Sequence, residues 1–246
     1  MKIVNINILE QVMHNLKSLR TALMAFCTCV VMPVSFAATA QSVGVIGMFK
    51  GSNITIQSEL IERLETQSKA LGCLMRREGK ILGRQGDYPL KNINAFFLLE
   101  CEGAILQNNS KAIVKALEKA TKNLMLVEGP MSQFGEFGLS KSGIHKSYII
   151  KLSDYNNEKP LQREEDLGQL SNMAKTRKHH YNNEAFVRIH NAYGMKRPDE
   201  AVMIFYDTPE DGPRFRSNNE DLMEKIGAFN QSHLSRFSYI SVISNR

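Results

Sequence analysis

The 246-residue chain lacks the short motifs that mark the common nucleotide-binding and hydrolytic enzymes. Its glycines never fall between a strand and a helix at the spacing of a phosphate loop or a dinucleotide fingerprint, and no serine-hydrolase nucleophile elbow occurs. His145 and His233 have no partner at the spacing of metal ligands, so we expect no metal site. These absences exclude the enzyme classes that such signatures define.

The sequence has no tryptophan and no low-complexity tract, and only one long apolar run stands out, over residues 21–37. Lys17 and Arg20 precede it, and the small-x-small sequence 38–40 follows it. A basic start, an apolar stretch and small residues at the end are typical of a secretory signal. We therefore predict a cleavable signal peptide over residues 1–40.

A membrane anchor and a lipoprotein are two other interpretations of this segment. An uncleaved membrane anchor is disfavoured because the apolar run is short and contains Pro33. A lipoprotein is disfavoured because the bulky Phe26 precedes Cys27, where a lipobox needs a small residue. Cleavage before Gln41 would leave a periplasmic or secreted protein with no stable membrane insertion.

The charge balance gives little indication of a partner. Removing residues 1–40 takes away three bases and one acid, so the formal charge falls from +6 to +4. The bases are spread along the chain rather than gathered in a run, so we expect no nucleic-acid partner. A small-molecule ligand or a protein remains as the expected partner, and no cofactor can be named from the sequence.

Cysteine is scarce, and half of it lies in the signal. Cys27 and Cys29 leave on cleavage, so that Cys73 and Cys101 remain. An even pair in an oxidising compartment predicts one disulfide, with two unbonded structural cysteines as the alternative.

The apolar periodicity predicts an α+β protein in which one order of elements, β-α-β-β-α-β, occurs twice. In the first half we expect strands at 43–49, 73–82, 95–101 and 124–127, with helices at 56–71 and from 109 or 110. In the second half we expect strands at 148–153, 186–193, 201–207 and 238–243, with helices at 162–180 and from the capping box at 217–220. These expectations divide the chain into residues 41–128, a connector at 129–146 and residues 147–246.

Each half has the order of a ferredoxin-like unit. A tandem copy of that unit resembles the dimeric α/β-barrel superfamily, whose antiparallel sheets pack face to face as a pseudo-dimeric barrel. The resemblance rests on element order alone, and two separate domains or a doubly wound fold remain open. It implies a cavity against the sheet faces that point away from the helices.

The first expected hairpin makes a geometric prediction. If its turn is centred on Asp87, then Cys73 lies directly opposite Cys101, within the distance that a disulfide bridges. A register slip of one residue would separate the two cysteines.

The second expected hairpin provides our candidate ligand site. With a turn centred near Arg197, Arg188 lies opposite Tyr206, and His190 falls on the same strand face. A guanidinium, an imidazole and a phenol can together bind an anion or move protons. The resemblance would place this trio on the barrel cavity, whereas ordinary polar residues on a solvated strand face are the alternative.

Three further groups have simpler explanations. His179 and His180 end a basic stretch that suits a helix C-terminus. Asp207, Glu210 and Asp211 fit a turn better than a cation site. Phe134 and Phe137 in the connector would act as a lid or partner surface, or pack between the halves.

No nucleophile–base pair or metal set can be assembled from these spacings. We therefore expect an exported binding or accessory protein of the cell envelope or secreted fraction that uses a crevice between sheets. The alternatives are a small dimeric α/β-barrel enzyme, of the oxygenase, isomerase or haem-linked types that the resemblance implies, and a structural subunit of an envelope assembly. Fold analogy alone does not choose among the three.

Overall fold

The computed structural model describes residues 42–51, 54–90, 92–108, 114, 121–133, 147–177, 181–206, 208 and 210–245. All of them lie in the second of the two compact units into which the chain divides, Ala40–Arg246. The signal peptide predicted over residues 1–40 lies outside the described residues. Within the described part, no helix has the length and apolar character that a membrane crossing requires.

Strands and helices alternate through this unit. Their order is β1 (Val43–Lys50), α2 (Ile54–Lys69), β2 (Cys73–Gly86), β3 (Ala95–Cys101), α3 (Ile105–Asn108), β4 (Lys122–Gln133), β5 (Ser147–Tyr155), α5 (Pro160–Lys175), β6 (Asn182–Arg188), β7 (Asn191–Tyr193), β8 (Glu200–Tyr206), α6 (Asp211–Asn218), α7 (Glu220–His233) and β9 (Leu234–Ser244).

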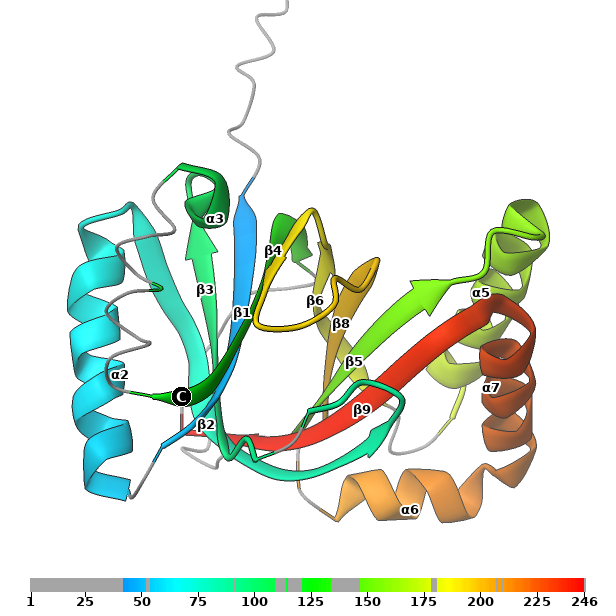
Figure 1. Ribbon diagram of the computed structural model, residues 1–246. Coiled ribbons are helices and arrows are strands. Elements are labelled where there is room, and N and C mark those ends of the chain that lie inside the picture. Colours follow the sequence, from blue (N-terminus) through cyan, green and yellow to red (C-terminus); the bar gives the residue numbers. More distant parts are fainter. Residues whose placement is uncertain are drawn as a thin grey trace, which may run out of the picture. The chain divides into compact units, whose positions relative to one another are not determined.

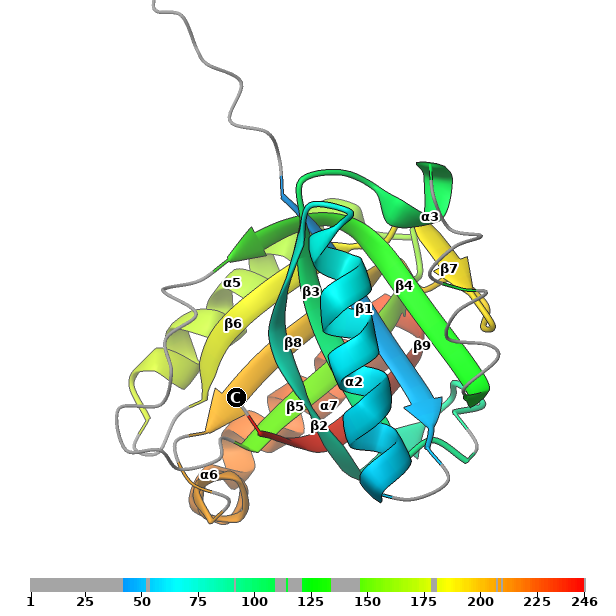
Figure 2. The ribbon, with the colours of Figure 1, turned by 90° about the vertical axis from the view of Figure 1, so that its left-hand side faces the viewer.

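The strands form one antiparallel sheet that closes into a barrel. Their order is β1-β3-β2-β9-β5-β8-β6-β4-β7, and a further pairing of β1 with β4 closes a ring of eight strands. The two halves meet edge to edge where β2 pairs with β9 and β4 with β6, so the two face-to-face sheets that we expected are parts of a single closed sheet. Helix α2 covers the strands of the first half, and α5 and α7 cover those of the second (Figures 1 and 2).

The two halves share their connectivity. The first half has the strand order β4-β1-β3-β2, and the second half has the corresponding order β9-β5-β8-β6. The central ladder of each half contains seven pairs, from Val43–Cys101 to Phe49–Ala95 in one and from Ser147–Tyr206 to Ser153–Glu200 in the other. Each position of β1 and β3 therefore has a counterpart in β5 and β8.

Strand alternation divides the apolar residues between the barrel interior and the helix-facing surface. In β1, Ile46 and Met48 pack in the interior, whereas Val45 and Phe49 pack beneath α2. A third core, which includes Phe215, lies between the second half of the sheet and its helices. Strands buried on both faces read as continuous apolar runs, which is why 43–49 and 95–101 were recognisable in the sequence.

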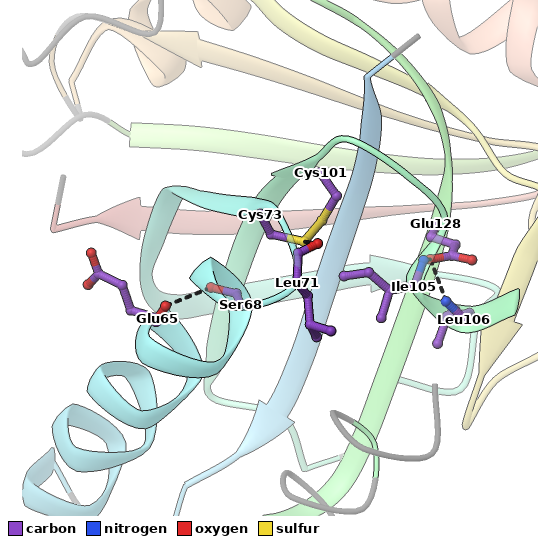
Figure 3. Close-up of a disulfide and its surroundings, with 8 residues drawn as sticks. All are labelled: Glu65, Ser68, Leu71, Cys73, Cys101, Ile105, Leu106 and Glu128. Carbon is purple, nitrogen blue, oxygen red and sulfur yellow. Dashed lines mark hydrogen bonds between the residues drawn. A yellow bond between two sulfur atoms is a disulfide. The ribbon is translucent and has the colours of Figure 1, made fainter. Parts of the chain in front are cut away.

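The predicted disulfide is confirmed. Cys73 and Cys101 are bonded and lie directly opposite each other in the β2–β3 ladder (Figure 3). A bulge shifts the register between Met75 and Arg77, but only beyond the cysteine pair. Both cysteines are buried in the core under α2.

The helices of the second half differ from the sequence-based expectation. The helix expected over 162–180 begins at Pro160 and ends at Lys175. The capping box expected at 217–220 is interrupted by Asn219, whose backbone is not helical (φ −138°, ψ 49°) and which ends α6 and precedes α7. The acidic turn is the start of α6, where Asp211 accepts a hydrogen bond from the Thr208 backbone N–H. The helix expected from 109 falls mostly outside the described residues.

Candidate functional site

The register of the second hairpin differs from the predicted one, and the predicted trio does not converge. Arg188 lies opposite Glu200, not Tyr206. The predicted turn was centred too late, because the chain turns at Gly194, with φ +71°, and a bulge follows Asn183. The prediction that these residues line an inner cavity is therefore wrong in its geometry.

The three side chains occupy different surroundings. Tyr206 pairs with Ser147 of β5 and is buried on the helix-facing surface against Tyr181 and Phe215. Burial is the main cause that raises the pKa of the Tyr206 phenol to about 12. Arg188 and His190 are exposed. A ligand-binding role for any of the three stays a prediction.

The barrel interior is filled by side chains. Apolar residues from both halves pack there, together with a buried ion pair in which Arg77 Nε lies 2.8 Å from Glu184 Oε1. The same Nε donates a hydrogen bond of 2.7 Å to the Tyr148 hydroxyl. This network joins β2 of the first half to β5 and β6 of the second, so it stabilises the pairing of the halves.

A polar cluster lies on the helix-facing surface of the second half, and the sequence analysis did not predict it. Lys151 of β5 and Glu200 of β8 are diagonal neighbours on this surface, because Lys151 pairs with Val202 and Ser153 with Glu200. Their counterparts in the first half are Gly47, which pairs with Phe97, and Ala95. A glycine and an alanine are thus matched by a lysine and a glutamate.

The lysine is enclosed by residues from α7 and β9. Its Nζ lies 3.1 Å from the Asn230 side-chain oxygen, 5.6 Å from the centre of the Phe229 ring and 5.8 Å from that of Tyr239. Asn230 Nδ2 in turn donates to the Tyr239 hydroxyl at 2.9 Å. Burial lowers the pKa of the Lys151 amine, and the charge of Glu200 opposes that effect.

The glutamate binds a tyrosine and lies close to an arginine. The Tyr155 hydroxyl donates to Glu200 Oε2, and the Arg163 guanidinium of α5 stacks 3.9 Å from the centre of the Tyr155 ring. Glu200 is 6 % exposed. Burial raises the pKa of its carboxyl, against the opposing effects of Tyr155 and Lys151. An amine whose pKa is lowered and a carboxyl whose pKa is raised therefore lie side by side, as in sites that transfer protons.

A groove between α5 and α7 adjoins this cluster at Phe229. It has a volume of about 180 Å³ and is lined by Asp166, Leu170, Met173, Lys225, Phe229 and Ser232, among others. Asp166 also borders a second hollow of about 320 Å³ around the ends of the two helices. The groove therefore combines an apolar floor with charged edges.

His233, for which spacing had suggested no partner, forms an ion pair in this region. Its Nε2 lies 2.8 Å from Asp166 Oδ2, and its ring packs against Phe229 with the centres 5.0 Å apart. The hydrogen bond from His233 is the main cause that lowers the pKa of Asp166. His145, His179, His180, Phe134, Phe137 and Asp207 lie outside the described residues.

No protein-family model matches the chain, and no curated protein sequence matches it. Solved structures do match. A chlorite dismutase from Candidatus Nitrospira defluvii in complex with imidazole has a TM-score of 0.54 at 11 % identity, over 83 % of this chain and 91 % of that chain. An anthrone oxidase-like protein has a TM-score of 0.53 at 10 % identity, over the same shares.

A third match is a protein described as a monooxygenase from Fusobacterium nucleatum subsp. nucleatum, with a TM-score of 0.50 at 9 % identity, over 84 % of this chain and 94 % of that one. These neighbours are dimeric α/β-barrel proteins, and at such low identity the likeness shows the fold alone. This chain is an α+β protein with a closed antiparallel barrel of that kind.

The comparisons correct our expectation of function. We expected an exported binding or accessory protein, because no catalytic set could be assembled from sequence spacing. The matching structures are described as enzymes or enzyme-like proteins, and they favour the enzyme alternative instead. The Lys151–Glu200 cluster is assembled by strand pairing and leaves no local motif, so sequence spacing could not find it.

Proposed function

We propose that the protein is a small dimeric α/β-barrel enzyme whose active site lies between the second half of the sheet and helices α5 and α7. Its reaction begins with the transfer of a proton between a small organic substrate and the Lys151–Glu200 pair. One observation carries this proposal: a partly buried amine and a buried carboxyl occupy positions where the first half has Gly47 and Ala95.

The chemistry follows from the environment of the pair. An amine with a lowered pKa gives up its proton more easily near neutral pH and can act as a base. A carboxyl with a raised pKa holds its proton longer and can act as an acid. Tyr155, which donates to Glu200, holds the carboxyl in place. Isomerases and oxygenases that start by removing a proton from carbon need such a pair.

Haem-linked chemistry, which the fold resemblance also implied, does not fit the described residues. Of the histidines described, His190 is exposed, and the Nε2 of His233 is bound to Asp166. Phe215, Leu222 and Phe229 fill the space between the sheet and its helices. The α5–α7 groove, with a volume of about 180 Å³, is too small to enclose a haem, although a smaller organic molecule could pack in it. No step of the proposed reaction therefore involves a haem.

The proposal extends to the origin of the fold. We infer that the two halves are tandem copies of a ferredoxin-like unit. The matched strand orders and the two ladders of seven pairs support this inference.

We also infer that the protein is exported to the periplasm or the extracellular space. The signal features of residues 1–40 support this, and so does the Cys73–Cys101 disulfide, because such bonds persist in oxidising compartments.

An exchange experiment tests the enzyme proposal without knowledge of the natural substrate. In deuterated water, the purified protein should accelerate loss of the benzylic C–H signal of anthrone, followed by NMR. The double variant Lys151→Met/Glu200→Met should lose this acceleration by about 10²–10⁴-fold, the usual contribution of general acid–base catalysis. The control Lys80→Met/Glu102→Gln changes exposed residues of the first half and should exchange as the wild type does. Equal exchange by the wild type and the double active-site variant would contradict the proposal.

A further inference from the structure

The surroundings of Lys151 resemble those of a reactive amine rather than those of a structural ion pair. The side chain is partly exposed, and its Nζ faces the Phe229 and Tyr239 rings. Its hydrogen bond at 3.1 Å is to a neutral amide oxygen, that of Asn230, whereas Glu200 bonds to Tyr155. Within the part of the chain that the structure describes, no carboxylate lies at hydrogen-bond distance from this amine.

We propose that Lys151 is a nucleophile that forms an imine with a small aldehyde or ketone, and that such a carbonyl compound is the substrate. This inference rests on the proposed function and names the substrate class of the same site. Desolvation next to apolar walls is one of the ways in which proteins activate a lysine amine for attack on a carbonyl. The lowered pKa of the amine supports the proposal.

The neighbouring carboxyl completes the chemistry. The neutral Nζ attacks the carbonyl carbon to form a C–N bond, and one of its protons passes to the oxygen, which gives a carbinolamine. Protonated Glu200 then donates its proton to the departing hydroxyl, so that the C–O bond breaks, water leaves and a protonated imine remains. Glu200, now a carboxylate, can remove a proton from the adjacent carbon to give an enamine and then return a proton to carbon, which restores the protonated imine. Water adds to this imine and the extra proton passes back to the Glu200 carboxylate, so that the C–N bond breaks, the carbonyl product leaves, and the neutral amine and the protonated Glu200 are restored.

The walls of the site define the kind of carbonyl compound that fits. Phe229 faces Lys151 on one side and lines the α5–α7 groove on the other, where Leu170 and Met173 add apolar surface. A flat apolar body could pack against these side chains while its carbonyl reaches the amine. We therefore expect aromatic aldehydes to react better than small polar ones.

Reductive trapping tests the imine directly. The purified protein is incubated near pH 7 with benzaldehyde and cyanoborohydride, and labelled lysines are located by peptide mass spectrometry. Lys151 should be labelled faster than the exposed Lys80 of the same molecule, because burial lowers the pKa of the Lys151 amine and so raises its neutral, nucleophilic fraction near pH 7. Acetaldehyde should show a smaller preference for Lys151.

Two variants separate nucleophilic reactivity from simple exposure. Lys151→Arg should remove the fast label while leaving the slow label on Lys80. Glu200→Gln should slow labelling of Lys151 while leaving that of Lys80 unchanged, because the acid that expels water is gone. Thermal melting curves of both variants show that the fold is retained.

The outcomes distinguish this inference from the proposed function. Labelling of Lys151 no faster than that of Lys80 would overturn the imine. If in that case the double variant no longer accelerated proton exchange, the proposed acid–base function would be supported without the imine. Fast labelling of Lys151 together with unchanged exchange in the double variant would support a reactive amine and contradict the proposed reaction.

Discussion

Each half of the barrel has a ladder of seven residue pairs that packs against helices, but the interface is apolar in the first half and contains charged side chains in the second. Under α2 the paired positions hold Gly47 and Phe97. The Phe97 ring fills the space that a side chain at position 47 would need. Under α5 and α7 the same positions hold Lys151 and Val202. Taking an amine and a carboxyl even partly out of water costs free energy that apolar residues of similar size would not cost. The second interface is therefore better explained by function than by stability.

The first half also buries a carboxylate, and its contacts show how a structural acid differs. Glu128 accepts hydrogen bonds from the backbone N–H groups of Ile105 and Leu106 (Figure 3). It also accepts one from the Asn191 side chain. These donors are all neutral, and by accepting from the first two the carboxylate stabilises the start of α3. Glu200, in contrast, shares its surroundings with an amine and a phenol that can both exchange protons.

The largest expected effect concerns the apolar interface. Phe97 is fully buried, so Phe97→Ala should lower the free energy of unfolding by about 3–5 kcal/mol. Its counterpart Val202 is smaller and partly exposed, so Val202→Ala should cost about 1 kcal/mol. Urea denaturation of both variants measures the difference. Equal losses would show that the two interfaces contribute alike to stability, and the contrast between the halves would fail.

The next expected effect is an increase in the free energy of unfolding. Replacing both members of the buried pair, Lys151→Met/Glu200→Met, should raise the free energy of unfolding by about 1–3 kcal/mol, because the charged groups no longer have to be desolvated. The same variant should no longer accelerate the proton exchange of anthrone. Urea denaturation and the anthrone assay on one preparation measure both quantities. A double variant that is strongly destabilised would indicate a structural role for the pair.

The disulfide and the first half of the fold could be predicted because they depend on local pairing. Cys73 and Cys101 belong to one hairpin, and the bulge in β2 comes after the cysteine pair, so a simple register sufficed. The second hairpin contains a bulge next to Asn183 and turns at Gly194. A simple register therefore predicted Tyr206 as the partner of Arg188, six residues away from its actual partner, Glu200.

The candidate site could not be predicted, because its members come from separate elements. Lys151 and Glu200 are 49 positions apart and meet only because β5 pairs with β8. His233 and Asp166 meet only because α7 packs against α5. The available signal was a lysine in the middle of an otherwise apolar strand, since a charge at a position expected to be buried marks a functional candidate.

The smallest expected effect is a change of stability with pH that the Glu200 carboxyl causes. Burial raises its pKa in the folded protein above the unfolded value of about 4.3, so folding favours the protonated form. Its contribution to stability is therefore fully present below about pH 4.3 and is lost as the pH rises through the folded pKa. Relative to Glu200→Gln, the wild type should gain stability as the pH falls from about 7 to 4, by about 1.4 kcal/mol for each unit by which the pKa is raised.

Asp166 provides a control of opposite sign for this pH experiment. Its pKa is lowered in the fold, chiefly by the hydrogen bond with His233, so its contribution is present above the unfolded value and lost as the pH falls through the folded pKa. Relative to Asp166→Asn, the wild type should therefore lose stability on acidification. Urea denaturation at several pH values measures both differences. If the wild type also lost stability on acidification relative to Glu200→Gln, the pKa of Glu200 would be lowered rather than raised in the fold, and the distinction between the two halves would rest on Lys151 alone.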